Sequence, residues 1–117
     1  MGRLTTHVLD LVRGAPASGM TIELASIGPS GRKVIAQTAT NRDGRCDAPL
    51  IEGEAFRSGV WQLEFHVAKY FAAQGVALPD PPFLDVVLVR FGVSNPGEHH
   101  HVPLLVTPWA YSTYRGS

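Results

Sequence analysis

The fold is decided near the middle of the chain, where residues 60–67 read VWQLEFHV. Apolar side chains at positions 61, 63 and 65 alternate with polar side chains at positions 62, 64 and 66. Successive side chains of a strand point to opposite faces of its sheet, so a period of two predicts a strand with one buried face. The chain is therefore expected to be built from sheets.

The same alternation, interrupted by Gly, Pro, Asn and Asp, continues on both sides of this stretch. It predicts strands at residues 4–12, 20–27 and 33–40, a very short strand around Arg45, a long strand at 84–93, and a closing hairpin of 99–107 and 109–115 joined at Pro108. The turn residues between the first three strands indicate a meander, and residues 49–59 are expected to form a loop.

One helix is expected, over residues 68–74. The side chains there are compatible with one or two helical turns, and Gly75 can end them. Pro79, Pro81 and Pro82 then exclude regular structure as far as Phe83.

Seven or eight short antiparallel strands, spaced by roughly ten residues, predict an all-β fold of two packed sheets. A single sheet of this size would leave an apolar face in water. The 117 residues suffice for one such sandwich with a continuous core, and they contain no internal repeat and no linker. We therefore expect one domain over residues 1–117, from which every functional residue must come.

The composition narrows the classes of function. Ten Lys and Arg residues balance ten Asp and Glu residues. With a net charge of zero, the chain lacks the excess of positive charge that binding to nucleic acid or to an acidic membrane requires. Cys46 is the only cysteine, which excludes an intrachain disulfide and is typical of a reducing compartment. No apolar run is long enough to span a membrane or to serve as a signal peptide. A cytoplasmic protein is the expectation.

Three histidines lie on strand faces that are otherwise apolar. His7 shares one face of the first strand with Leu9, while His99 and His101 share a face with Leu105. The opposite faces of these strands are apolar as well, yet a two-sheet sandwich buries only one face of each sheet. We therefore expect another subunit to cover the second face, with the histidines in or near the interface of an oligomer.

Several roles are open for these side chains. His99 and His101 project together and could hold a metal ion, for which only His7 offers a third ligand. They could instead be hydrogen-bonded structural residues of a partly buried site, or they could act as acids and bases. Arg45 follows a tight turn, where an arginine is ordinarily a solvated charge. A triad hydrolase and nucleotide binding have no support, because the chain has neither a Gly-x-Ser-x-Gly elbow nor a phosphate-binding loop.

Four stretches of the chain stand out as a set. They are Thr6–Asp10 with Gly14 and Pro16, Thr40–Asn41 with Asp43–Arg45, His99–Leu105 with Pro108, and Tyr111–Ser117. In this order, and over essentially the whole length, they resemble the 5-hydroxyisourate hydrolases, also called transthyretin-related proteins. The closing Tyr-Arg-Gly-Ser is the most specific element, because the hormone-carrying transthyretins share the preceding Tyr-Ser-Thr but continue with other residues.

The resemblance implies a transthyretin-like (prealbumin-like) β-sandwich that assembles as a homotetramer, a dimer of dimers, with active sites in a channel between the dimers. It implies that the catalytic residues are His7, Arg45 and His101. The substrate-binding residues that it implies are His7, Arg45, His99, His101, Tyr114 and Ser117. His100 stands where the family usually has tyrosine, and because strand parity turns it away from His101 we expect altered packing and unaltered chemistry.

The reaction implied is hydrolysis of a cyclic amide in purine metabolism. The six-membered ring of 5-hydroxyisourate opens to 2-oxo-4-hydroxy-4-carboxy-5-ureidoimidazoline during the degradation of urate to allantoin, without a cofactor or a metal. Attack of water on the amide carbonyl needs a base and a group that offsets the oxyanion charge. His7 and His101 are expected to activate the water, with the choice of base between them open, and Arg45 to orient the substrate. The alternative is a transthyretin-like carrier whose channel holds a small molecule without chemistry.

Overall fold

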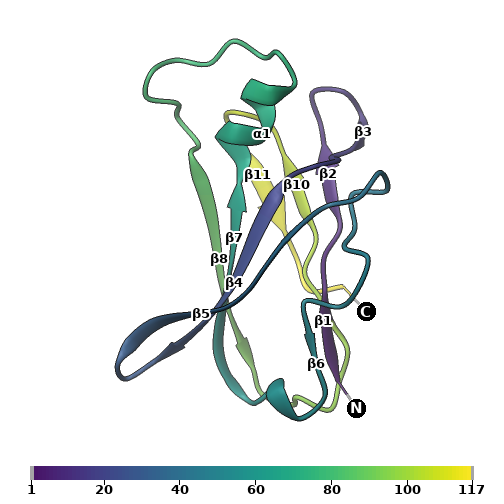
Figure 1. The fold of residues 1–117 in the computed structure, drawn as a ribbon, viewed down its shortest axis with the longest axis vertical. Helices are drawn as coiled ribbons and strands as arrows, with labels where there is room; N and C mark the ends of the chain where they lie inside the picture. The colour runs from purple at the N-terminus through teal and green to yellow at the C-terminus, as the bar shows by residue number, and fades with distance from the viewer. Residues whose placement is uncertain (1, 117) are drawn as a thin grey trace.

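A computed structural model describes residues 2–116, and its strands lie in two layers on either side of an apolar core (Figure 1). The strands are β1 (Arg3–Thr5), β2 (Val8–Asp10), β3 (Ala15–Pro16), β4 (Thr21–Gly28), β5 (Gly31–Ala39), β6 (Ile51–Glu52), β7 (Gly59–His66), β8 (Val86–Val93), β9 (His100–His101), β10 (Leu104–Val106) and β11 (Tyr111–Thr113). The helical elements are the 3₁₀ helix η1 (Gly53–Ala55) and the helix α1 (Val67–Ala73). Neither helix of this described part has the length and apolarity that crossing a membrane requires.

The first layer is an antiparallel sheet in the order β5-β4-β7-β8. β7 is the alternating stretch, and its predicted inner face is confirmed, because Trp61, Leu63 and Phe65 are buried against the second layer. Burying one such side chain stabilises a fold by about 1.5–3 kcal/mol. The period of two therefore identifies the face that holds the sandwich together.

The second layer consists of two short sheets joined end to end, β6-β1-β9 and β11-β10-β2-β3. β1 runs on into β2, and β9 into β10, after a two-residue break in each. Hydrogen bonding continues across the breaks, since the N–H of Val102 donates to the carbonyl of Thr5 at 2.9 Å and that of Leu104 donates to the carbonyl of His7 at 2.9 Å. Pro103 has no N–H to donate, which accounts for the interruption between β9 and β10.

The predicted all-β sandwich of two sheets is confirmed (Figure 1). When β1–β2 and β9–β10 are each counted as one interrupted strand and the two-residue β3 is set aside, eight strands remain, within the predicted number. The predicted helix is also confirmed, because α1 covers Val67–Ala73 and is followed by Gly75 with a φ of 82°.

The predicted topology is wrong in four places. The first three strands form no meander, because β2 pairs with β3 and β10 in one layer while β4 and β5 belong to the other. The pairings of β1 with β9 and of β2 with β10 are parallel, not antiparallel. Residues 49–59 are no plain loop, since they contain β6 and η1. No strand forms around Arg45, because the side-chain carbonyl of Asn41 accepts the N–H groups of Asp43 and Arg45 and holds them in a turn.

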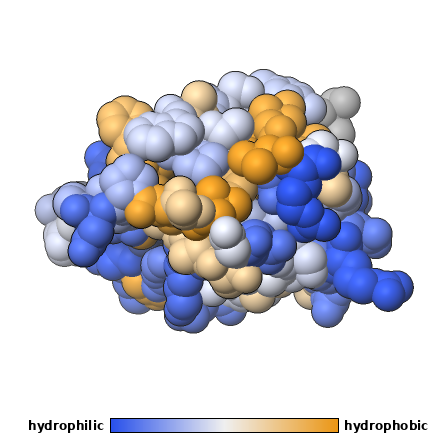
Figure 2. All heavy atoms as spheres, turned by 90° about the horizontal axis from the view of Figure 1, so that it is seen from above, coloured by the Kyte–Doolittle hydropathy of each residue, from blue (hydrophilic) through white to orange (hydrophobic). Residues whose placement is uncertain are grey.

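One end of the molecule exposes apolar side chains. Figure 2 looks down on the end that carries α1 and shows apolar surface among polar side chains. The exposed apolar residues of the turns and loops include Leu11, Val12, Phe83 and Trp109. The rings of Phe83 and Trp109 stack with their centroids 5.9 Å apart. Exposed apolar surface of this kind is typical of a site that contacts another protein surface.

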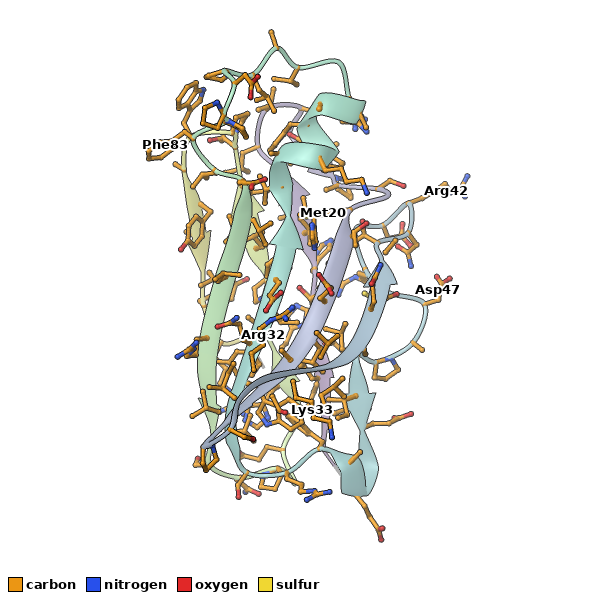
Figure 3. The ribbon with its side chains drawn as sticks, turned by 60° about the vertical axis from the view of Figure 1, so that its left-hand side comes forward. Met20, Arg32, Lys33, Arg42, Asp47 and Phe83 are labelled. Atoms are coloured by element: carbon orange, nitrogen blue, oxygen red, sulfur yellow. The ribbon has the colours of Figure 1, made fainter. Side chains whose placement is uncertain are left out.

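The outer face of the first layer holds a polar network on β4, β5 and β7. Arg32, labelled in Figure 3, donates two hydrogen bonds to the carboxylate of Glu64, which also accepts from Gln62 at 2.9 Å. These partners explain how Gln62 and Glu64 can be buried on a face predicted to be polar. The hydrogen bond from Arg32 is the main reason why the pKa of Glu64 lies below its usual value. Next to it, His66 lies 2.9 Å from Glu23.

Candidate active site

The outer face of the second layer brings the site residues of β1 and β2 to the surface. Leu4 and Val8 point into the core and are fully buried, whereas Thr5 and His7 point outward and remain partly exposed. This is the alternation that strand parity predicts. β9 lies beside β1 in parallel register, so that His101 is paired with Thr5 and shares its outward face.

The hydroxyl of Thr5 joins two histidine rings. Its Oγ1 lies 2.7 Å from Nε2 of His99 and 2.8 Å from Nδ1 of His101. The two histidines are 94 and 96 positions away in the sequence. Sequence reasoning missed Thr5, although its parity with His7 was a usable signal; only the pairing of β1 with β9 reveals its partners.

A tight turn delivers Arg45 to the same face. The N–H of Asn41 donates to the carbonyl of Arg45 at 2.7 Å, which closes the turn. The N–H of Val8 donates to the carbonyl of Gly44 at 2.8 Å, which fastens the turn to β2. Arg42 and Asp47, labelled in Figure 3, are exposed, as is Arg45. Of the two arginines, only Arg45 lies beside His99 and His101.

Two hollows meet at the histidines. The first has a volume of about 430 Å³, and its lining includes Thr5, Arg45, His99 and His101. The second, of about 730 Å³, is lined by Glu98, His99, His101, Tyr114, Arg115 and Gly116. His99 and His101 line both. Volumes of this order accept a small heterocycle.

All three histidines of this face resist protonation. Burial is the main cause that lowers the pKa of His7, and the charge of Arg45 adds to it, against a hydrogen bond with the backbone of Asp43. Burial likewise lowers the pKa of His101, assisted by the charges of Arg45, His99 and His7. Burial and the charge of Arg3 lower the pKa of His99. Neutral imidazoles beside a guanidinium can accept a proton from water while the arginine holds an anion.

The last described residues run beside His101. The N–H of Gly116 donates to the carbonyl of His101 at 2.7 Å. A Cβ at Gly116 would lie 2.9 Å from Cδ2 of the His101 ring, so the ring packs against the glycine backbone. Arg115 donates to the carbonyl of His99 at 3.2 Å. Sequence reasoning did not predict that Gly116 packs against the His101 ring, because this contact depends on where the fold places the end of the chain.

The other predicted site residues are placed as follows. Tyr114 is exposed and lines the second hollow. His7 lines neither hollow, although the charge of Arg45 lowers its pKa and His7 in turn lowers the pKa of His101. Ser117 lies outside the described residues. Within residues 2–116, no group of three or more His, Cys, Asp or Glu side chains is arranged to hold a metal ion.

His100 and Cys46 lie near the site without facing it as reactive groups. His100 is buried, donates through Nδ1 to the carbonyl of Glu98 at 3.0 Å, and packs edge-on against Phe56 with ring centroids 5.4 Å apart. It points away from His101, as parity predicts. Cys46 lines the first hollow, but burial raises the pKa of its thiol, which disfavours the nucleophilic thiolate.

Comparisons with known proteins agree over the whole chain. The model of the HIUase/transthyretin family matches residues 4–116. The 5-hydroxyisourate hydrolase of Ralstonia nicotianae is 58% identical over 117 residues, covering 100% of both chains. The solved structure of the 5-hydroxyisourate hydrolase of Klebsiella pneumoniae is 31% identical with a TM-score of 0.82, covering 100% of this chain and 94% of that one.

Two further solved structures show the range of proteins with this fold. An (S)-allantoin synthase is 44% identical with a TM-score of 0.93; the match covers 99% of this chain but 44% of that one. Sea bream transthyretin in complex with thyroxine is 29% identical with a TM-score of 0.87, covering 97% of this chain and 94% of that one. The same sandwich thus occurs in proteins of different names.

Proposed function

This chain belongs to the HIUase/transthyretin family, and we propose that it carries out its chemistry with His7, Arg45 and His101. Its activity is the hydrolytic opening of 5-hydroxyisourate to 2-oxo-4-hydroxy-4-carboxy-5-ureidoimidazoline in urate degradation. One observation supports the choice of residues above the others. Arg45, His99 and His101 line a single hollow, with His7 electrostatically coupled to Arg45 and His101.

In the proposed mechanism a neutral histidine removes the proton from water while the oxygen attacks the ring amide carbonyl. The tetrahedral intermediate then collapses, the carbonyl–nitrogen bond of the ring breaks, and the leaving nitrogen takes the proton from the histidine, which returns to its neutral form. His7 and His101 both stay neutral near pH 7, because burial lowers the pKa of each below 6.5. Proton removal by a positioned base contributes about 10²–10⁴ to the rate. The choice of base between the two stays open.

Arg45 would supply the positive charge that offsets the oxyanion formed on the attacked carbonyl. A guanidinium offers paired N–H donors that suit a planar, polar ring and the developing oxyanion. A donor aimed at an oxyanion is worth about 10²–10³ in kcat. Tyr114 would close the second hollow over the substrate. Ser117 is proposed as a substrate-binding residue on the family resemblance alone.

Ultraviolet absorbance of freshly generated 5-hydroxyisourate, followed with and without the protein, tests the function. The protein should accelerate the decay catalytically, at concentrations far below that of the substrate, and a chelator should leave the rate unchanged. A carrier like the thyroxine-binding transthyretin would instead bind the compound stoichiometrically and leave its decay at the spontaneous rate.

The rate should fall on the acid side with a midpoint below pH 6.5, the ordinary pKa of histidine. A base must be neutral to accept a proton, and the lowered pKa of His7 and His101 keeps both neutral at more acid pH. The acid limb of kcat/KM reports the pKa of the base in the free enzyme. A measured midpoint at or above 6.5 would contradict the burial of these rings. The same shift destabilises the fold progressively as the pH falls from 6.5 to the lowered pKa of the folded histidines, because over that range unfolded histidines bind protons that the folded ones do not.

The protein is further proposed to form a homotetramer, a dimer of dimers, in the cytoplasm. β8 and β11 each end their sheet with an edge that has no strand partner among residues 2–116, and both lie on the same side of the sandwich (Figure 1). Such edges favour pairing with a second copy. The exposed apolar end offers a surface for a second contact (Figure 2). The outward histidine face is a further candidate. Light scattering should give a mass four times the 12.6 kDa of the chain. A monomer mass would contradict the assembly.

A further inference from the structure

The hydroxyl of Thr5 sits between two imidazoles, and its hydrogen bonds restrict the protonation of both. A hydroxyl has one hydrogen to donate and two lone pairs, and a neutral imidazole has one N–H and one bare nitrogen. Oγ1 lies 2.7 Å from Nε2 of His99 and 2.8 Å from Nδ1 of His101. The single hydroxyl hydrogen can serve one ring only, so for two hydrogen bonds between neutral groups the other ring must donate.

Three arrangements satisfy this condition. In the first, Nδ1–H of His101 donates to Oγ1 and the Thr5 hydroxyl donates to Nε2 of His99. In the second, both hydrogen bonds are reversed, so that Nε2 of His99 carries the hydrogen and Nδ1 of His101 is bare. In the third, both rings donate to the two lone pairs of Oγ1, and the hydroxyl hydrogen then serves neither ring. The first and the third leave Nε2 of His101 bare and able to accept a proton, and of these only the first also uses the hydroxyl hydrogen. The second puts the hydrogen of His101 on Nε2, where it blocks that role.

The first arrangement also keeps both of its hydrogen bonds during the reaction step. When Nε2 of His101 takes a proton from water, the resulting imidazolium still donates from Nδ1 to Oγ1, and Oγ1 still donates to His99. The oxygen of that water keeps the electron pair of its broken O–H bond and uses it to attack the amide carbonyl. No hydrogen bond has to reverse during this step. The second arrangement would require both to reverse before His101 could act.

We propose that Thr5 is a positioning residue, whose hydroxyl, held by His99 as acceptor, fixes His101 in the tautomer with a bare Nε2. The inference rests on the proposed function of His101. The backbone supports it, because Thr5 is paired with His101 in the register of β1 and β9, and the carbonyl of Thr5 accepts from Val102 at 2.9 Å. Threonine is branched at Cβ, which restricts χ1 and keeps the hydroxyl aimed at the two rings.

The matched variants are Thr5→Val, which keeps the shape and removes the hydroxyl, and Thr5→Ser, which keeps the hydroxyl. We expect Thr5→Val to lower kcat about 10–100-fold with KM changed less than about threefold. Thr5→Ser should stay within about fivefold of the wild-type kcat, because the hydroxyl can still bridge the rings. In ¹⁵N spectra of histidine-labelled protein, His101 should carry its proton on Nδ1 in the wild type and lose that preference in Thr5→Val.

The double variant separates tautomer control from packing. His99→Phe removes the acceptor at the far end, and if both residues act through one chain of hydrogen bonds, adding it to Thr5→Val should lower kcat little further, whereas the loss of a substrate contact by His99 shows in KM. Wild-type kcat in Thr5→Val, or a His101 that carries its proton on Nε2, would overturn the inference. A fully active His101→Asn would instead contradict the proposed role of His101 as a base. The failure of that role can therefore be distinguished from the failure of the role proposed for Thr5.

Discussion

Single replacement of Arg45, His7 or His101 should lower kcat/KM by two or more orders of magnitude. Arg45→Ala removes one of the two guanidinium groups that line the first hollow, the other being that of Arg3, and with it the charge proposed to offset the oxyanion. His7→Asn and His101→Asn remove a candidate base, worth about 10²–10⁴ in rate. The steady-state rate with fresh 5-hydroxyisourate measures each loss.

The chain offers matched controls for these variants. Arg42 belongs to the same turn as Arg45 but lines neither hollow, so Arg42→Ala should keep the wild-type rate. His66 lies on the opposite layer beside Glu23, and His66→Asn should also leave the rate nearly unchanged. Light scattering and circular dichroism should show that all the variants keep the assembly and the fold. Wild-type rates in the Arg45 and both histidine variants would contradict the proposed site, and the relative sizes of the two histidine effects would identify the base.

Gly44→Ala should destabilise the fold by about 3 kcal/mol or more. Gly44 has a φ of 74°, which side chains other than glycine adopt only at a cost. A Cβ there would also lie 2.4 Å from the carbonyl oxygen of Val8 and 3.1 Å from Cβ of Pro16. The clash is with backbone and cannot be relieved by a rotamer change. Because the carbonyl of Gly44 holds the turn to β2, the change should also displace Arg45 and reduce activity.

Gly14→Ala is the control for this prediction. Gly14 has a similar φ of 67°, but nothing lies within 4 Å of a Cβ built on it. It should therefore lose only about 1 kcal/mol, the cost of the backbone conformation. Thermal unfolding at one fixed protein concentration compares the two variants, because assembly makes the midpoint depend on concentration. Equal midpoints for Gly44→Ala and Gly14→Ala would contradict the argument from close approach.

Strand faces could be predicted from the sequence because the pleat imposes a period of two wherever a strand forms. The period places Leu63 inside and His7 outside with no knowledge of any neighbour. It does not identify a strand's partner, and for this reason the parallel pairing of β1 with β9 was not foreseen in a fold predicted to be antiparallel. The strand expected around Arg45 failed for a local reason, since the hydrogen bonds of Asn41 compete with a sheet ladder.

The site was accessible to sequence reasoning only in part. The outward faces of His7, His99 and His101 follow from parity, and the identity of the candidate residues follows from the family resemblance. The contact of Thr5 with two rings follows from neither, because it joins residues 94 and 96 positions apart. The same holds for Gly116, whose lack of a side chain matters only because the ring of His101 lies against it.

The sequence by itself determined the class of fold, the faces of the strands, the helix and the turn chemistry. These properties depend on backbone sterics and on side chains a few residues apart, which act in the same way before and after the chain folds. The tertiary structure alone decided which strands pair, that Arg45 reaches the histidine face, and that Thr5 bridges His99 and His101. Such contacts exist only after two layers have packed, because the apolar core fixes the register that brings distant residues within hydrogen-bonding distance.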